Sequence, residues 1–199
     1  DKYSSISIKQ DVPIIPSGSQ ELRPHRLKVG LFDITDNELV RRKSVELDVV
    51  GAQSEVRELV GEKVADLLLI NDGDLSFAKI RLDERSISTM KKHLGGLKDN
   101  LARALCWSCC WDMLRDAEIS ATDFVEIALS GLPGEDDITT VTVLGGQLSS
   151  AVEIYASDKN RDALREKIAT AIQSLLLKAK PGSDFQLQYA RIFANLAHT

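Results

Sequence analysis

Three cysteines and two tryptophans fall within six positions of this 199-residue chain, in the stretch ALCWSCCWDML at residues 104 to 114. Thiols this close together could hold a metal ion or form a redox pair. Cys106 and Cys110 are one helical turn apart, but a closed zinc site needs four ligands, and the only nearby histidine, His93, is not at a spacing that common zinc modules use. A redox Cys-x-x-Cys pair opens a helix, whereas Cys106 and Cys109 lie inside a predicted one. We therefore predict that the three thiols pack in the core like small hydrophobic side chains.

The three histidines, His25, His93 and His198, are scattered over both halves of the chain. No H-E-x-x-H sequence is present, so a hydrolytic zinc site within this chain is not expected. The stretch NDGD at residues 71 to 74 offers oxygen ligands and a glycine. It lacks the residue order and the distal glutamate of a calcium loop. Because apolar runs flank it, we interpret it as a hairpin turn between two strands.

Three further stretches resemble functional motifs without meeting their requirements. The Gly145-Gly146 pair lacks the further glycines and the lysine of a phosphate loop. SGLPGE, which begins at Ser130, is not the G-x-S-x-G of a nucleophile elbow. The charged run from Asp158 to Lys167 is typical of a solvated helix face with i,i+4 ion pairs. We therefore predict no catalytic, cofactor-binding or metal-binding residue in this chain.

Composition and charge exclude several classes of protein. A formal net charge of −5 and a pI near 5.3 argue against a nucleic-acid or anionic-membrane partner, because both bind a clustered basic surface. No run approaches the roughly 18 apolar residues of a membrane span, and the first residues lack the basic and apolar regions of a signal peptide. An odd number of cysteines, two of them adjacent, argues against a disulfide framework and favours a reducing compartment. We predict a globular cytoplasmic protein without nucleic-acid or membrane partners.

The first part of the chain, up to about Leu82, has the pattern of β-strands. Apolar residues tend to alternate, as at Val45, Leu47 and Val49, in short segments rich in β-branched residues. Turn-forming residues separate these segments in PIIPSGSQ, DITDNE, GAQ and NDGD. Strands that follow one another without intervening helices indicate an antiparallel sandwich. We predict strands at about residues 3–10, 22–34, 39–50, 54–60, 66–71 and 76–82.

After Asp83 the apolar period becomes that of helices, and capping residues recur at their starts. The fourth helix competes with a strand at residues 138 to 144, because DITTVTV is rich in β-branched residues, but the neighbouring segments favour a helix. We predict six helices, which begin at Asp83 or Ser86, Asp99, Ser120, Asp136 or Asp137, Asp158, and Ser183. The first ends near Leu94, the second near Arg115, the third near Gly131 and Pro133, and the fifth before Pro181.

These patterns predict an α+β chain of two domains. Residues 1–82 form an antiparallel β-sandwich, and residues 83–199 form the first part of a larger helical domain. Its antiparallel helix pairs are typical of a bundle or of an α-solenoid such as a HEAT-like superhelix, and no repeat of fixed period decides between them. The chain begins at Asp1 without a methionine and stops within a predicted helix. We therefore expect it to be a segment of a longer protein.

Several long stretches resemble one enzyme family. LRPHRLKVGLFD at residues 22–33, NDGDLSFAKIRLD at 71–83, ARALCWSCCWDMLRDAEISATDFVEIALSGLP at 102–133 and PGSDFQLQYARIFA at 181–194 are similar to the C-terminal half of bacterial aminopeptidase N of the actinobacterial type. The resemblance covers nearly the whole chain and keeps the family's order.

The resemblance implies a parent zinc metallo-aminopeptidase of four domains, which removes N-terminal residues from peptides. Its peptide-binding G-x-M-E-N strand, its H-E-x-x-H with a downstream glutamate and its catalytic tyrosine would lie outside this chain. No catalytic or zinc-binding residue is therefore carried over, and the segment alone is predicted to be inactive. The implied partners are the catalytic domain of the parent, which holds the zinc, and peptide substrates reached through it. The sandwich would act as a spacer or hinge, and the helices would wall and gate the active-site cavity.

Two other functions remain open at this point. A free-standing helical scaffold that binds a peptide or protein is the alternative, because arrays of helix pairs form extended binding surfaces. A hydrolase acting through Ser, Cys or Asp would need a nucleophile and a base that the fold brings together. The segment hypothesis predicts an unusually apolar surface patch, since the partner domain is missing.

Overall fold

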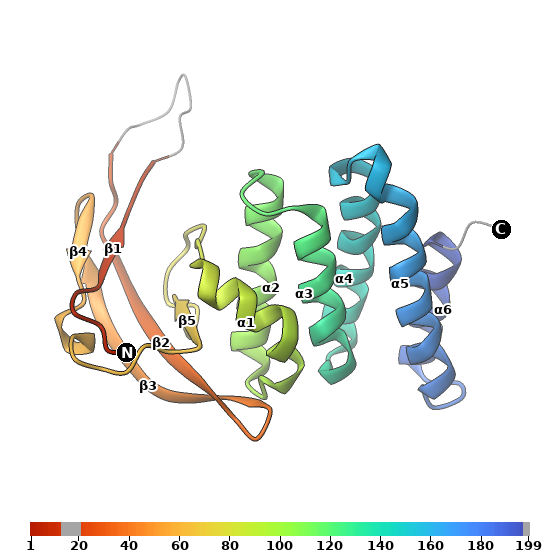
Figure 1. Cartoon of the computed structure of the whole chain (residues 1–199), viewed down its shortest axis with the longest axis horizontal. Coiled ribbons are helices and arrows are strands. Elements are labelled where there is room, and N and C mark those ends of the chain that lie inside the picture. The colour runs from red at the N-terminus through yellow and green to blue at the C-terminus, as the bar shows by residue number, and fades with distance from the viewer. Residues whose placement is uncertain (13–20, 197–199) are drawn as a thin grey trace.

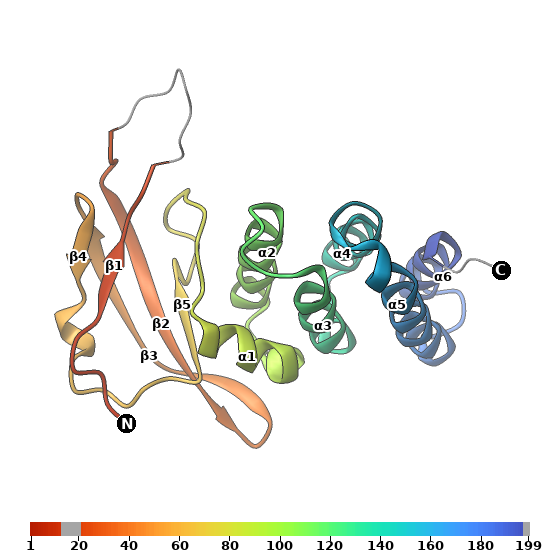
Figure 2. The same cartoon turned by 45° about the horizontal axis from the view of Figure 1, so that its top comes forward.

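The chain forms a row of layers in which two small sheets are followed by six helices (Figure 1). The computed structural model describes residues 1–12 and 21–196. Turning the molecule by 45° shows the same order, with the sheets at one end and α6 at the other (Figure 2). This arrangement confirms the predicted α+β fold class, in which antiparallel strands precede a helical array.

All strand pairs in the described residues are antiparallel. One sheet has two strands in the order β1-β4, and the other has three in the order β3-β2-β5. A β-bulge interrupts the β2–β3 pairing at Leu31/Phe32. The strands span Ser7–Lys9 (β1), His25–Thr35 (β2), Glu38–Val49 (β3), Gln53–Glu55 (β4) and Leu67–Ile70 (β5).

The three-stranded sheet packs on both of its faces. Successive side chains of a strand point to opposite faces, and here each face meets a different core. In β2, Leu31 packs with residues of the two-stranded sheet, whereas Phe32 packs with the helices. In β5, Leu68 packs toward the two-stranded sheet and Leu69 toward the helices. The sheet is therefore a layer shared by the sandwich and the helical array.

Several predicted strands are shorter than expected. The predicted strands at 3–10 and 54–60 shrink to β1 and β4, and the second of these ends in a 3₁₀ turn at Arg57–Leu59. The predicted turn DITDNE forms a tight hairpin between β2 and β3, with Asp36 and Asn37 at φ 50° and 66°. The predicted turn PIIPSGSQ lies at residues 13–20, outside the described residues.

The predicted strand at residues 76–82 is wrong. These residues have no regular structure, so the interpretation of NDGD as a hairpin turn is also wrong. The physical reason is that helix α1 packs against β5, where the backbone amide of Leu68 donates to Ser86 Oγ at 3.0 Å. The segment is held instead by ion pairs from Lys79 and Arg81 to Asp116.

All six predicted helices are present. Asp83 caps α1 by accepting from the Ser86 amide, Asp99 caps α2 in the same way, and Ser120 and Asp123 form the predicted capping box of α3. The domain boundary predicted after Leu82 stays a prediction. The helices span Glu84–His93 (α1), Asn100–Arg115 (α2), Ala121–Gly131 (α3), Ile138–Ser150 (α4), Asp158–Lys178 (α5) and Asp184–Leu196 (α6).

The fourth helix forms despite its β-branched residues. The Asp137 carboxylate accepts hydrogen bonds from the Thr139 and Thr140 amides and so caps α4. The Thr140 hydroxyl also donates to this carboxylate, and this bond together with the amides lowers the pKa of Asp137. Gly145 lies where α4 packs against α6, and a Cβ at this position would lie 2.5 Å from a carbon of Ile192. Packing and capping therefore outweigh the strand propensity.

Alanine substitutions at the two adjacent glycines of α4 are expected to change the stability of the protein in opposite directions. A Cβ at Gly146 would meet no atom within 4 Å, so Gly146→Ala is expected to stabilise the protein by about 0.5–1 kcal/mol through helix propensity. Gly145→Ala must displace Ile192, and overpacking of this kind costs about 1–3 kcal/mol. Urea denaturation of both variants measures the difference, and equal stabilisation by the two alanines would contradict this account of the contact between α4 and α6.

Candidate functional site

The cysteine cluster is part of the helical core. Cys106 and Cys110 are fully buried and Cys109 is 5% exposed, all on α2, which confirms the predicted packing role. All three are free thiols. The polar stripe of α2 faces outward, with Ser108 and Arg115 exposed.

Burial sets the chemistry of these thiols. It raises the pKa of Cys109 to about 12 and raises the pKa of Cys106 and of Cys110 as well. A thiol near 12 instead of the ordinary 9.0 has on the order of 1000-fold less thiolate at neutral pH. The three cysteines are therefore poor nucleophiles and poor metal ligands in the folded protein.

We expect the native thiols to resist alkylation at pH 8 and to react quickly once urea unfolds the chain. Because the folded pKa values are raised, their contribution to stability is complete below about pH 9 and is lost as the pH rises toward 12. Thiol labelling followed by mass spectrometry, and urea denaturation between pH 8 and 11, measure the two effects. Complete labelling of the native protein within minutes would contradict the burial.

The histidines and the other candidate motifs do not converge on a site. His25 Nδ1 lies 2.5 Å from Ser76 Oγ, and His93 Nδ1 lies 3.1 Å from Asn37 Oδ1. His198 is outside the described residues. Across residues 1–12 and 21–196, no three His, Cys, Asp or Glu side chains come together as a metal site would require.

The charged run of α5 pairs differently from the prediction. Its local ion pairs join residues three apart, Asp158 with Arg161 and Asp162 with Arg165, and not four apart. Arg165 also donates to Glu153, which precedes the helix. The SGLPGE stretch ends α3 and forms a 3₁₀ turn at Leu132–Gly134.

A groove of about 390 Å³ runs between α5 and α6. Its charged side chains include Asp162 and Arg165, which are paired with each other at 3.0 Å. The groove is lined by Asp162, Arg165, Glu166, Ala169, Thr170, Gln173, Phe193 and Leu196. This lining holds no Ser, Cys or His side chain.

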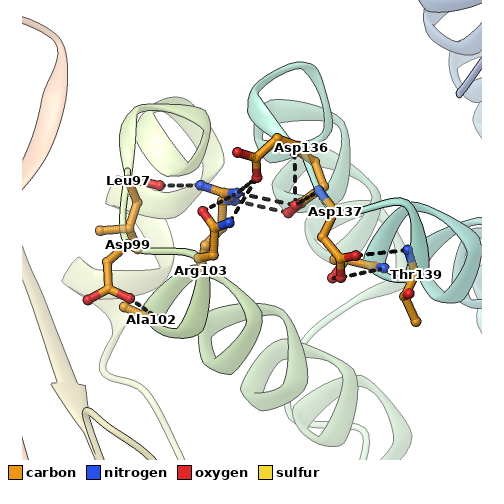
Figure 3. Close-up of polar contacts among 10 residues, drawn as sticks. Leu97, Asp99, Ala102, Arg103, Asp136, Asp137 and Thr139 are labelled. Atoms are coloured by element: carbon orange, nitrogen blue, oxygen red, sulfur yellow. Dashed lines mark hydrogen bonds and ion pairs between the residues drawn. The ribbon is translucent and has the colours of Figure 1, made fainter.

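One group of polar side chains that the fold brings together lies at the start of α2 and α4 (Figure 3). Arg103 is 2% exposed, and its Nε donates to Glu135 Oε2 at 3.0 Å. Its Nη1 donates to the Leu97 carbonyl, and its Nη2 reaches Glu135 and Asp136 at 3.2 Å. Glu135 in turn accepts from the backbone amides of Asp136 and Asp137. We call Arg103, Glu135 and Asp136 the Arg103 cluster.

A second polar group joins the three-stranded sheet to α2. Arg41 on β3 donates to both carboxylate oxygens of Asp72, at 2.7 and 2.8 Å, and to Asp99 Oδ2 at 2.7 Å. The Asp72 side chain is 2% exposed. The amide of Ala102, with help from Arg41, lowers the pKa of Asp99, which is also the cap of α2. We call Arg41, Asp72 and Asp99 the Arg41 clamp.

Sequence reasoning missed both groups. Arg103 did carry a signal, since it is a cation within an otherwise apolar helical stretch, and a buried charge requires a partner. Asp72 belongs to NDGD, whose sequence predicts a hairpin turn between two strands, and nothing local indicates that its side chain is buried against Arg41.

The chain matches a known protein family and a bacterial relative. Residues 67–199 match the family described as the ERAP1-like C-terminal domain. The chain belongs to this family. It is also 43% identical over 200 residues to the aminopeptidase N of Streptomyces lividans, and this alignment covers 98% of the present chain. The resemblance to a C-terminal part of aminopeptidase N is thereby confirmed.

The chain spans only 23% of the length of that Streptomyces relative. The family match begins at Leu67 in β5 and includes all six helices. No helix in the described residues is both long and apolar enough to cross a membrane. The activity, substrates and partners of the relative belong to a much longer chain, so for the present chain they are proposals.

Proposed function

We propose that this chain is a non-catalytic C-terminal segment of a zinc-dependent aminopeptidase N. The observation that carries this proposal is the 43% identity to aminopeptidase N over 98% of the chain, together with the family match over residues 67–199. In this proposal the zinc and the catalytic residues belong to another part of the parent chain, and the parent is a cytoplasmic protein. Residues 1–82 are its sandwich, and residues 83–199 are the start of its helical domain. The buried thiols and paired charges of the described residues support a structural role for this segment.

The proposed role of the helices is to wall the cavity in which peptides are cleaved. A wall must keep its shape, and the helices share one continuous core that runs from the three-stranded sheet to α6. Such a wall admits short peptides by shape and excludes folded chains, and it also keeps bulk water from the reacting groups. The sandwich would serve as the spacer or hinge that holds this wall at its distance from the catalytic part.

The proposed partner is the catalytic part of the same parent chain. Phe77 supports such a contact, because its side chain is fully exposed while neighbouring hydrogen bonds hold the loop in place. Asn71 Nδ2 donates to the Ser76 carbonyl at 2.7 Å, and the Ser76 amide donates to Asn71 Oδ1 at 3.0 Å. A large apolar side chain on an ordered loop is suited to burial against a partner.

Phe77→Ser is expected to leave the stability of the 199-residue chain unchanged within about 0.5 kcal/mol, because the side chain touches little in it. In the full parent enzyme the same substitution is expected to cost about 1.5–3 kcal/mol if the catalytic part covers Phe77. Thermal unfolding of the two proteins in parallel measures the difference. An equal, small effect in both would show that another surface makes the contact.

The activity test compares the purified chain with the full parent enzyme on a panel of aminoacyl arylamides, with and without a zinc chelator. We expect turnover that the chelator abolishes from the parent and no turnover from this chain. Chelator-sensitive turnover that co-purifies with the chain would overturn the proposal. If neither protein turned over any arylamide, the scaffold alternative would be favoured, and peptide binding by the chain would become its direct test.

A further inference from the structure

We propose that the Arg41 clamp and the Arg103 cluster form one polar connection that fixes the helical array against the three-stranded sheet. The connection begins on β3 and ends at the start of α4, so it joins parts of the chain that are about a hundred residues apart. It makes the sheet and the first four helices one rigid body. This inference concerns the mechanics of the chain itself and does not depend on the proposed peptidase role.

The first step of the connection is the contact from the sheet to the turn after β5. The guanidinium of Arg41 binds the Asp72 carboxylate with two hydrogen bonds, a geometry that restricts both side chains. Gly30 leaves room for this carboxylate, since a Cβ there would lie 2.5 Å from Asp72 Oδ2. The guanidinium also lies 5.0 Å from the ring centroid of Phe32, which is itself part of the helical core.

The second step passes from the sheet to α2. The remaining contact of Arg41 is with Asp99 Oδ2, while Asp99 Oδ1 accepts from the Ala102 amide at 3.1 Å. One carboxylate therefore serves as the cap of α2 and as the acceptor for a side chain of the sheet. Beside it, the backbone of Gly96 lies so close to the Asn37 carbonyl that a Cβ would approach it to 2.5 Å.

The third step passes from α2 to α4. The Arg103 amide donates to the Asp99 carbonyl at 2.9 Å, one turn into the helix that Asp99 caps. The Arg103 side chain then binds Glu135, which accepts from the Asp137 amide at 2.7 Å. Asp137 caps α4, so the connection ends at the N-terminus of a second helix (Figure 3).

On each side of the Arg41–Asp99 contact, the connection includes buried charged groups. The carboxylate of Asp72 and the guanidinium of Arg103 are each 2% exposed, so neither can exchange its partner for water without a large desolvation cost. A movement of β3 away from the turn after β5 must therefore break the pair between Arg41 and the buried Asp72 carboxylate, and a movement of β3 away from α2 must break the Arg41–Asp99 pair, whose side chains are 35% and 39% exposed. We infer that the segment from β2 to α4 contains no hinge, and that the sandwich acts as a rigid spacer.

The test is hydrogen–deuterium exchange of Arg41→Gln, with Arg42→Gln as the matched control. The two arginines are adjacent on β3 and similarly exposed, at 35% and 27%, but Arg42 pairs with Asp33 and Glu62 within the sheet region. We expect Arg41→Gln to accelerate exchange by about tenfold or more at residues 99–103 and 135–140, with little change in α5 and α6. Arg42→Gln should leave both of these segments unchanged.

Two results would overturn the inference. Faster exchange confined to residues 38–43 and 71–74 would mean that the clamp is local and does not reach the helices. The same acceleration in every element, α5 and α6 included, would mean that Arg41 acts only on global stability. If Arg41→Gln fails to fold, Arg41→Lys keeps the charge without the two parallel hydrogen bonds, and the same pattern of exchange is expected from it in weaker form.

Discussion

Glu135→Ala is expected to lower the free energy of unfolding by about 3–5 kcal/mol, because it leaves the Arg103 guanidinium buried without its main partner. Both side chains are 2% exposed, and their closest contact is 3.0 Å. The substitution also removes the acceptor of the Asp136 and Asp137 amides at the start of α4. Urea denaturation followed by circular dichroism measures the loss of stability.

Asp136→Ala is the matched control for this substitution. Asp136 binds the same guanidinium at 3.2 Å, but its own side chain is 74% exposed. An exposed partner contributes about 0–1 kcal/mol, so the two adjacent alanines are expected to differ several-fold in effect. Similar losses from both would mean that burial of the ion pair does not decide its energy. Glu135→Gln keeps an acceptor for the amides and should fall between the two.

Phe124→Ala is expected to destabilise the protein by about 3–5 kcal/mol through the cavity that it leaves. Phe124 is fully buried on α3, in the part of the core where α3 packs against its neighbours. Its ring centroid lies 5.4 Å from that of Trp111 on α2, a contact that the substitution also removes. Thermal unfolding should show a fall in midpoint of about 10 °C or more for a chain of this length.

Val143→Ala serves as the control for Phe124→Ala. Val143 lies on the neighbouring helix α4 with 53% of its surface exposed. Its truncation opens no cavity and improves helix propensity, so a change within about 0.5 kcal/mol is expected. If Phe124→Ala cost no more than this control, α3 would not be packed as the structure describes, and the continuous core proposed for the wall would be in doubt.

A rigid connection through Arg41 and Arg103 changes the expected role of the sandwich. The resemblance to aminopeptidase N left open whether this domain is a spacer or a hinge. A hinge needs a few residues that absorb a change in backbone angles without breaking buried contacts. The contact between β3 and α2 instead holds the Arg41–Asp99 ion pair at 2.7 Å, and the backbone of Gly96, just before α2, packs closely against Asn37. This arrangement favours a spacer, and the exchange experiment on Arg41 decides between the two roles.

Much of the helical half could be predicted from the sequence because helix signals are local. A cap acts over three or four residues, so Asp83, Asp99 and Ser120 could be recognised without knowledge of the fold. The apolar circumference of α2 likewise indicated that Cys106 and its neighbours are core residues. Reasoning from local pattern failed for residues 76–82. Their sequence has the apolar pattern of a strand, but α1 packs against β5, the strand that they would have joined.

The sequence by itself determined most of the element types, the order of strands before helices, the buried cysteines and the resemblance to aminopeptidase N. Only the tertiary structure decided where the charges are buried. Arg41 and Asp72 are 31 positions apart, and Arg41 and Asp99 are 58 apart, so no local pattern links them. The cost of burying a charge depends on whether a partner lies within hydrogen-bond distance. That distance exists only after the sheet and the helices have packed together.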